Sequence, residues 1–437
     1  MATTIPVGST GRQADDLAKD SVAAFGQAEV ETAPEGLLYV ARQPILDGRG
    51  NVHGYELLFR SGPTATMFTG DGDSATRKVL DNTVIFGLER LSGGLPVFVN
   101  CTLEAILHRL VLVLPPELTV LELLETLEPT TELLDACTEL KALGFRLALD
   151  DFAWTPGWEP FVAMADYIKI DLSITAPEGR ANLMRRLRKF PARLVAERVE
   201  TQTDMEAAKR EGFTLFQGYY FCRPKILENR AVPSNRRVHL EMLHALHEEP
   251  LNTQRISNLV KREPSLTYRL LRMVNSPLFA TRKEVTSIHG ALVMIGDDVF
   301  RRVAMLAIAS ELRGDRPSEL LRMAFLRGRF CELAAAVMQR DATEQYMLGI
   351  LSLLPAMLGV TMQNIANGLP LRKEVQQALL GEENAERTIL RWLESYELAQ
   401  WEQCDASSLS AKIGEPRLSQ MYAEALLWAE KNMSLAG

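Results

Sequence analysis

The sequence predicts an α/β barrel followed by an all-α helical bundle, and two observations carry this prediction. Over residues 37–225, short apolar strands alternate with amphipathic stretches, a pattern typical of a parallel sheet. From about residue 237 the strands stop and apolar residues recur at helical spacing. A length of 437 residues suits two or three domains of ordinary size.

Eight strand candidates lie in the first region, which favours a modified TIM-like barrel. They cover 38–45, 52–60, 96–102, 119–124, 146–152, 167–172, 193–199 and 215–221. Only the turn 47–51 separates the first two, so we expect a hairpin there and one antiparallel strand. The region is short compared with the usual length of about 250 residues, so the barrel should be compact, with short or missing helices.

The helical region contains ten periodic segments and forms the second domain of the predicted organisation. They cover 238–247, 252–261, 265–275, 287–295, 297–312, 317–339, 343–353, 372–380, 385–397 and 415–433. Residues 1–36 are polar and read as a disordered tail, and 226–236 as a linker. We therefore expect a barrel domain over 37–225 and a helical domain over 237–437.

Charge and cysteine content exclude several classes of protein. The formal net charge is −8, and residues 226–437 carry 25 basic and 25 acidic side chains. No segment is basic overall, which argues against bulk nucleic-acid binding but not against a single bound nucleotide. Five scattered cysteines without a CxxC pair fit a reducing, cytoplasmic setting. The uncharged stretch 345–371 is interrupted by Ser352 and Pro355, so we expect a buried helix and no membrane partner.

Polar side chains occur near the ends of seven of the eight predicted strands, where barrel enzymes carry their chemistry. The set is Glu56, Asn100, Glu122, Asp150 with Asp151, Lys169 with Asp171, Glu197 and Gln217. Carboxylates that converge on one mouth repel one another unless cations neutralise them, and their oxygens suit Mg²⁺ or Mn²⁺. Two such ions could support a phosphodiester displacement, with Lys169 holding the water and Arg60 pairing with a phosphate. For any single residue, a solvated charge at the rim is an equally good interpretation.

The order of these motifs resembles that of EAL domains, the cyclic di-GMP phosphodiesterase family. The matching segments are QPILDGRGNVHGYELLFR (43–60), VFVNCT (97–102), LELLE (121–125), LALDDF (147–152), YIKID (167–171), VAERVE (195–200) and FQGYYF (216–221). The resemblance implies metal ligands at Glu56, Asn100, Glu122, Asp150, Asp151 and Glu197. It also implies a catalytic lysine at Lys169, substrate contacts at Arg60 and Gln217, and a loop-stabilising role for Glu125.

Three departures from the family pattern concern the surroundings of the site. The signature tripeptide reads Glu56-Leu57-Leu58, with leucine in place of the central alanine. The loop after the fifth strand carries Ala153 and Trp154 where the family has glycine and a small residue, so Trp154 could block or line the site. Arg198 replaces a glycine.

The helical half resembles the HDOD module over SLTYRLLRMVNSPLFATRKEVTSIHGALVMIGDDVFRRVAMLA (265–307). HDOD modules are related to HD phosphohydrolases that hold metal through a histidine–aspartate pair. Here Ser352 and Leu353 stand at that pair's positions, so we expect no metal site in this half. The two halves together are similar to EAL–HDOD bacterial signalling proteins.

Two functions of different class follow from the resemblance. In the first, the barrel binds Mg²⁺ or Mn²⁺ and hydrolyses cyclic di-GMP to pGpG, with Glu56 and Lys169 as catalytic residues. In the second, the barrel is an inactive sensor or docking platform. In both, the helical domain relays the signal to a protein partner, and a homodimer is left open.

Overall fold

The structure is a computed structural model, and it describes residues 40–59, 88–175, 177–222, 237–248, 250–262, 264–275, 285–313, 318–366 and 371–436. The predicted tail (1–36), the predicted linker (226–236) and Arg60 lie outside the described residues.

Eight strands close into a barrel in sequence order, which confirms the predicted fold class. They are β1 (Val40–Asp47), β2 (Val52–Phe59), β3 (Val97–Cys101), β4 (Thr119–Leu123), β5 (Arg146–Leu149), β6 (Tyr167–Asp171), β7 (Arg193–Glu197) and β8 (Leu215–Gln217). The antiparallel strand is β1, which runs against both β2 and β8, while the remaining neighbours are parallel. Asp47 closes the β1–β2 turn by accepting hydrogen bonds from the backbone of Arg49 and Asn51.

Short helices connect the strands, as the length of the region predicts. They are α3 (Leu88–Ser92), α4 (Leu103–Leu107), the 3₁₀ turn η1 (Leu110–Val113), α5 (Thr131–Ala142), α6 (Glu159–Met164), α7 (Pro177–Leu187) and α8 (Gln202–Glu211). Threonine caps begin the helices α4, α5 and α8, and Thr201 forms a capping box with Asp204.

One apolar layer fills the inside of the barrel, because side chains alternate between its two faces. The layer consists of Ile45, Phe98, Val120, Ala148, Tyr167, Val195 and Leu215, all buried. The next inward-facing residue of each parallel strand lies two positions later, closer to the carboxyl end. The layer therefore forms a dry floor beneath whatever side chains follow it.

The described residues of the second half form helices and no strands, also as predicted. Its helices are α9 (Arg237–Leu246), α10 (Thr253–Lys261), α11 (Pro264–Val274), α12 (Ile288–Ile295), α13 (Asp297–Arg313), α14 (Ser318–Met338), α15 (Ala342–Leu351), α16 (Leu354–Leu358), α17 (Met362–Ala366), α18 (Lys373–Leu379), α19 (Ala385–Glu397), α20 (Trp401–Asp405), α21 (Ser408–Ile413) and α22 (Glu415–Ala436). The sequence prediction lacked α16, α17, α20 and α21, which are too short to show a helical period. No helix in the described ranges combines the length and apolarity that crossing a bilayer requires.

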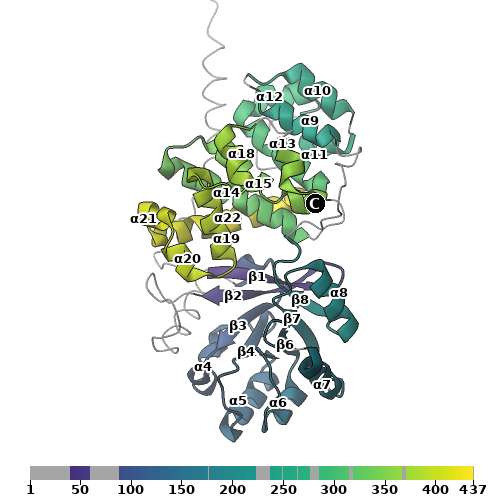
Figure 1. Cartoon of the computed structure of the whole chain (residues 1–437), viewed down its shortest axis with the longest axis vertical. Helices are drawn as coiled ribbons and strands as arrows, with labels where there is room; N and C mark the ends of the chain where they lie inside the picture. Colours follow the sequence, from purple (N-terminus) through teal and green to yellow (C-terminus); the bar gives the residue numbers. More distant parts are fainter. Residues whose placement is uncertain are drawn as a thin grey trace, which may run out of the picture.

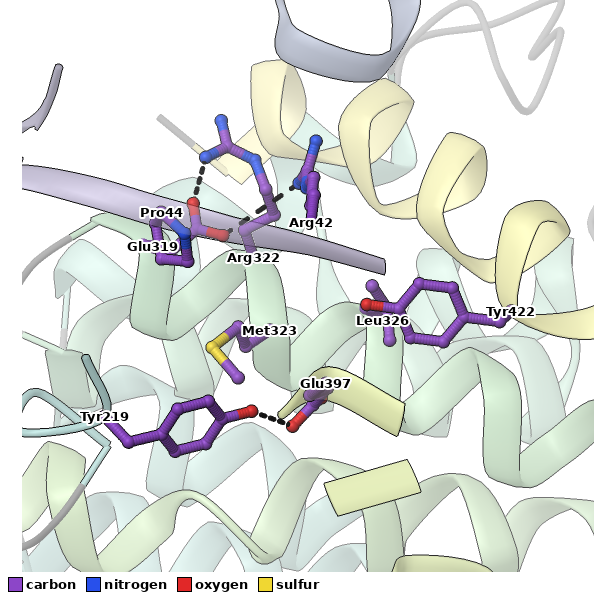
Figure 2. Close-up of a pocket in the computed structure, with 9 residues that line it drawn as sticks. All are labelled: Arg42, Pro44, Tyr219, Glu319, Arg322, Met323, Leu326, Glu397 and Tyr422. Atoms are coloured by element: carbon purple, nitrogen blue, oxygen red, sulfur yellow. Dashed lines mark hydrogen bonds and ion pairs between the residues drawn. The ribbon is translucent and has the colours of Figure 1, made fainter. Parts of the chain in front are cut away.

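The two halves meet along β1 and β2, which lie beneath the helical half in Figure 1. Arg42 of β1 pairs with Glu430 of α22 at 2.7 Å, and its guanidinium lies 4.3 Å from the ring centre of Tyr55. The Tyr55 hydroxyl donates a 2.7 Å hydrogen bond to Glu319 of α14. Further along this interface, the Tyr219 hydroxyl donates to Glu397 at 2.6 Å (Figure 2). Because side chains alternate along a strand, β2 presents Tyr55 to the helices and Glu56 to the barrel interior.

Candidate functional site

A polar layer covers the apolar floor at the carboxyl ends of the strands. Counting two residues beyond each floor residue of the parallel strands β3 to β8 gives Asn100, Glu122, Asp150, Lys169, Glu197 and Gln217. The strand β2 adds Glu56, which is 5% exposed. The fold thus brings together all the strand-borne site residues that the sequence predicted and that lie among the described residues.

Lys169 lies at the centre of this layer and is 1% exposed. Its ammonium contacts four carboxylates at once: Asp150 at 2.7 Å, Glu122 at 2.8 Å, Glu56 at 2.9 Å and Glu197 at 3.0 Å. One positive charge cannot balance four buried negative charges. The excess negative charge has to be neutralised by protons on the carboxylates or by other cations.

Two amide side chains orient Glu56. Gln217 donates a 2.6 Å hydrogen bond to one of its oxygens, and Asn100 donates a 3.2 Å hydrogen bond to the other. The amide of Gln217 also donates to Gln43 of β1 at 2.9 Å. Glu56 is therefore held from both sides as well as by Lys169.

Burial and the shared ammonium set the protonation of the cluster. Burial raises the pKa of Glu197 to about 8 and that of Glu122 well above its ordinary value, against the opposing attraction of Lys169. Burial acts to raise the pKa of Glu56 too, but Lys169 and the amide hydrogen bonds outweigh it and the pKa falls below its ordinary value. Burial acts to lower the pKa of Lys169, but the surrounding carboxylates raise it well above its ordinary value. Lys169 is therefore a proton donor in hydrogen bonds and not a base.

Several oxygens of the layer suit a bound cation. Among the described residues, Asn100 Oδ1, Glu122 Oε2, Glu197 Oε2 and Gln217 Oε1 are buried without a hydrogen-bond donor. Hard oxygen ligands of this kind are those that Mg²⁺ and Mn²⁺ prefer. Within the described ranges, however, no three acidic, histidine or cysteine side chains are already arranged around a metal position, because the carboxylates face Lys169 instead. The ligand chemistry fits a divalent cation, which would have to displace the ammonium from part of its shell.

The rim above this layer carries a second group of charges. Asp171 accepts hydrogen bonds from the backbone and hydroxyl of Ser173 and pairs with Arg198 at 2.8 Å. Arg198, which replaces a family glycine, keeps a positive φ of 52°, and its side chain is 64% exposed. Burial and the charges of Asp171 and Glu125 raise the pKa of Asp151.

Trp154 packs beside the barrel mouth and does not line the cavity. Its ring contacts Phe152 and Phe190, and the Arg186 guanidinium lies 3.7 Å from its centre. The large side chain that departs from the family pattern is therefore directed towards α7. Glu125 is exposed beyond β4, and its loop-stabilising role stays a prediction.

An open cavity of about 580 Å³ lies over the polar layer. This volume is in the range of small-molecule sites, about 300–1,000 Å³. The barrel contributes Gln43, Glu56, Asp150, Asp151, Lys169, Glu197, Arg198, Glu200, Gln217, Gly218 and Tyr219, and the helical half contributes Leu398 and Gln400.

The two residues at the HD-type metal positions have other roles in the helical half. Ser352 donates a hydrogen bond to the carbonyl of Gly349 at 2.7 Å and accepts one from Arg327 at 3.1 Å. Arg327 also binds Glu397 at 2.6 Å. Leu353 is buried in the apolar core.

Sequence reasoning missed Gln43, Glu200, Leu398 and Gln400 as parts of this site. Gln43 lies in the middle of β1, and the rule of searching carboxyl strand ends fails for the antiparallel strand. Its pairing with Glu56 in the hairpin register was the available signal. Leu398 and Gln400 come from the other half of the chain, and no local pattern marks them.

Comparison with known proteins identifies both halves. The EAL domain model matches residues 98–224 and the HDOD domain model matches 232–394. A protein of Vibrio cholerae named "Cyclic di-GMP phosphodiesterase CdgJ" is 33% identical over 398 residues, which cover 90% of this chain and 92% of that protein. The chain belongs to the EAL–HDOD family. A second EAL–HDOD relative, the uncharacterized protein YuxH of Bacillus subtilis, is 32% identical and covers 91% of this chain and 99% of its own length.

Solved structures similar to this EAL–HDOD protein are more distant. The FimX EAL domain from Pseudomonas aeruginosa, bound to cyclic di-GMP, is 21% identical, covers 46% of this chain and 95% of that domain, and has a TM-score of 0.35. The matched EAL segment begins at residue 98, after the hairpin that carries Glu56, and the strand pairing places this hairpin in the barrel.

Proposed function

We propose that this EAL–HDOD protein hydrolyses cyclic di-GMP to linear pGpG with the help of Mg²⁺ or Mn²⁺. The observation that carries the proposal is the convergence of four carboxylates on the single ammonium of Lys169, beneath an open cavity of about 580 Å³. Such an excess of buried negative charge is balanced well by divalent cations. The name of the Vibrio cholerae relative supports the choice of substrate.

The residues divide into three roles in this proposal. Glu56, Asn100, Glu122, Asp150, Asp151 and Glu197 would hold the cations, which when bound would supply an activated water and neutralise charge on the phosphodiester. Lys169 stays protonated and donates a hydrogen bond that orients the attacking water. Gln217 holds Glu56 in place at 2.6 Å. Water attacks the phosphorus of one phosphodiester, the bond to the ribose 3′ oxygen breaks, and the leaving oxygen receives a proton.

The sensor alternative rests on one specific observation. In the described residues the carboxylates are arranged around Lys169 and not around a metal position. A protein in this state would bind the nucleotide without cleaving it. Binding without turnover under both metals would select this alternative.

A comparison of two glutamate variants tests the enzyme proposal. Glu56→Ala removes a central ligand, and we expect pGpG formation to fall by about 100-fold or more, the scale for losing one electrostatic stabiliser. Glu132→Ala is the matched control, because Glu132 is an exposed residue of α5 away from the cavity. Equal pGpG formation by the two variants would contradict the assignment of the site.

We further infer that the helical domain relays the signal to a protein partner. Tyr268 of α11 and Val293 of α12 are 66% and 73% exposed, and large apolar side chains of this kind suit a protein contact. A Tyr268→Ser, Val293→Ser double variant should keep hydrolysis but lose the cellular effect of the protein. An unchanged cellular effect would contradict the inference.

A further inference from the structure

We propose that the Leu398–Gln400 segment of the helical domain is part of the nucleotide-binding site of the barrel. The proposal rests on the proposed function and names the wall that would hold a guanine base. Both Leu398 and Gln400 line the same cavity as Glu56, Asp150 and Lys169. The site is therefore built from both domains, and an isolated barrel would lack one wall.

The chemistry of this wall differs from that of the polar layer. The polar layer is carboxylate-rich and suits cations with a phosphodiester, whereas Leu398 offers an apolar surface that is 39% exposed. The Gln400 side chain offers one acceptor and two donors, which match the mixed donor and acceptor edge of guanine. The structure thus assigns the phosphates to the polar layer and one base to the helical wall.

The segment is held firmly in its place over the cavity. Its backbone amides donate to the last turn of α19: Leu398 to Glu394 at 3.2 Å, Ala399 to Tyr396 at 3.0 Å and Gln400 to Ser395 at 2.8 Å. Ala399 has a φ of 54°, a left-handed conformation that is unfavourable for a residue with a Cβ. Asp151 and Arg198, which line the same cavity, also have positive φ. Strained residues of this kind gather at ligand sites.

A buried anchor joins this segment directly to the barrel. Glu397 immediately precedes it and accepts the 2.6 Å hydrogen bond from Tyr219 of the barrel, as Figure 2 shows. The guanidinium of Arg327 binds both oxygens of Glu397, at 2.6 and 3.1 Å. Tyr219 lies two residues after Gln217, which orients Glu56. The same short stretch of the barrel therefore contacts Glu56 of the polar layer through Gln217 and Glu397 of the helical half through Tyr219.

Two variants of the full-length chain test the wall. Gln400→Ala and Leu398→Ala should each raise the KM for cyclic di-GMP about 2- to 10-fold, the scale of one lost hydrogen bond or apolar contact, with kcat unchanged. Gln254→Ala on α10 and Leu112→Ala are the matched controls, because both residues are exposed and lie outside the cavity. Their KM for cyclic di-GMP should stay within about twofold of the wild-type value. Equilibrium dialysis in EDTA gives the Kd without turnover.

A double-variant comparison tests whether the Tyr219–Glu397 hydrogen bond positions the Leu398–Gln400 segment. Tyr219→Phe removes the hydrogen bond to Glu397 and should also raise the KM. Because the anchor acts through the Leu398–Gln400 segment, Gln400→Ala should raise the KM by a smaller factor in the Tyr219→Phe background than in the wild type. Strictly additive effects would mean that Tyr219 does not position the wall.

The possible outcomes separate this proposal from the proposed function. If the wild type binds or hydrolyses cyclic di-GMP and both wall variants match it in KM and Kd, the wall proposal is wrong and the function stands. Faster turnover in the variants would make the segment an obstruction, which also contradicts the proposal. If the wild type neither binds nor hydrolyses the nucleotide, both proposals fail together.

Discussion

Removal of the Lys169 ammonium is the perturbation whose effect the structure specifies most fully. Lys169→Met keeps the length of the side chain but leaves Glu56, Glu122, Asp150 and Glu197 without their shared counter-ion. Removing one partner of a buried ion pair costs about 3–5 kcal/mol. We expect a loss of this size in the free energy of unfolding of the metal-free protein at pH 8, measured by urea denaturation.

The loss should depend on pH with a definite sign. The pKa of Glu197 is already raised to about 8, above its ordinary value of 4.5, and removing the ammonium raises it further. The folded state then binds protons more tightly than the unfolded state. The contribution of Glu197 to the free energy of unfolding is therefore greatest at low pH and falls as the pH rises from about 4.5 through 8. At pH 5 we expect the carboxyls of the Lys169→Met variant to be protonated, so the loss in its free energy of unfolding should be smaller than at pH 8. Added Mn²⁺ should restore the stability of the variant at pH 8.

Lys141→Met is the matched control for this variant. Lys141 pairs with Asp166 at 2.7 Å, but the two side chains are 29% and 32% exposed. A pair of this kind contributes about 0–1 kcal/mol. A loss of folding free energy for Lys169→Met that is no larger than that for Lys141→Met at pH 8, or that is the same at pH 5 as at pH 8, would contradict this prediction.

Three further predictions concern cation binding, Trp154 and Gly218. Binding of Mn²⁺ should release protons near pH 7, because Glu197 and Glu122 must ionise to bind the cation. The heat of Mn²⁺ binding, measured by titration calorimetry, should therefore vary with the ionisation enthalpy of the buffer. A heat of binding that is the same in all buffers would contradict this prediction. Trp154→Ala should cost about 1–3 kcal/mol in urea denaturation, below the ~3–5 kcal/mol of a fully buried tryptophan, with an unchanged KM; a changed KM would place Trp154 at the site. Gly218→Ala should lower the free energy of unfolding by more than about 2 kcal/mol, because the added Cβ would lie 2.2 Å from the Val199 carbonyl oxygen at a φ of +141°. Gly179→Ala on α7 is the matched control: the added Cβ meets nothing within 4 Å, so this variant should be neutral or stabilising.

The barrel and its polar layer could be predicted because both follow from a period of two. Each strand places an apolar residue such as Val120 on the floor and a polar residue such as Glu122 two positions later. The hairpin turn at 47–51 also gave the antiparallel strand, since so short a connection cannot join parallel neighbours.

The remaining parts of the site depend on how distant segments pack. The orientation of Trp154 is set by Phe190 and Arg186, which no local pattern links to it. Leu398 and Gln400 line the barrel cavity next to the Tyr219–Glu397 hydrogen bond, whose residues are 178 positions apart. Such contacts need the three-dimensional arrangement of both domains.

The most direct test of the central claim is the formation of pGpG by the purified full-length protein from cyclic di-GMP, measured by chromatography with Mg²⁺, with Mn²⁺ and with EDTA. We predict pGpG in at least one of the two metals and none in EDTA. Intact cyclic di-GMP under both metals would contradict the account.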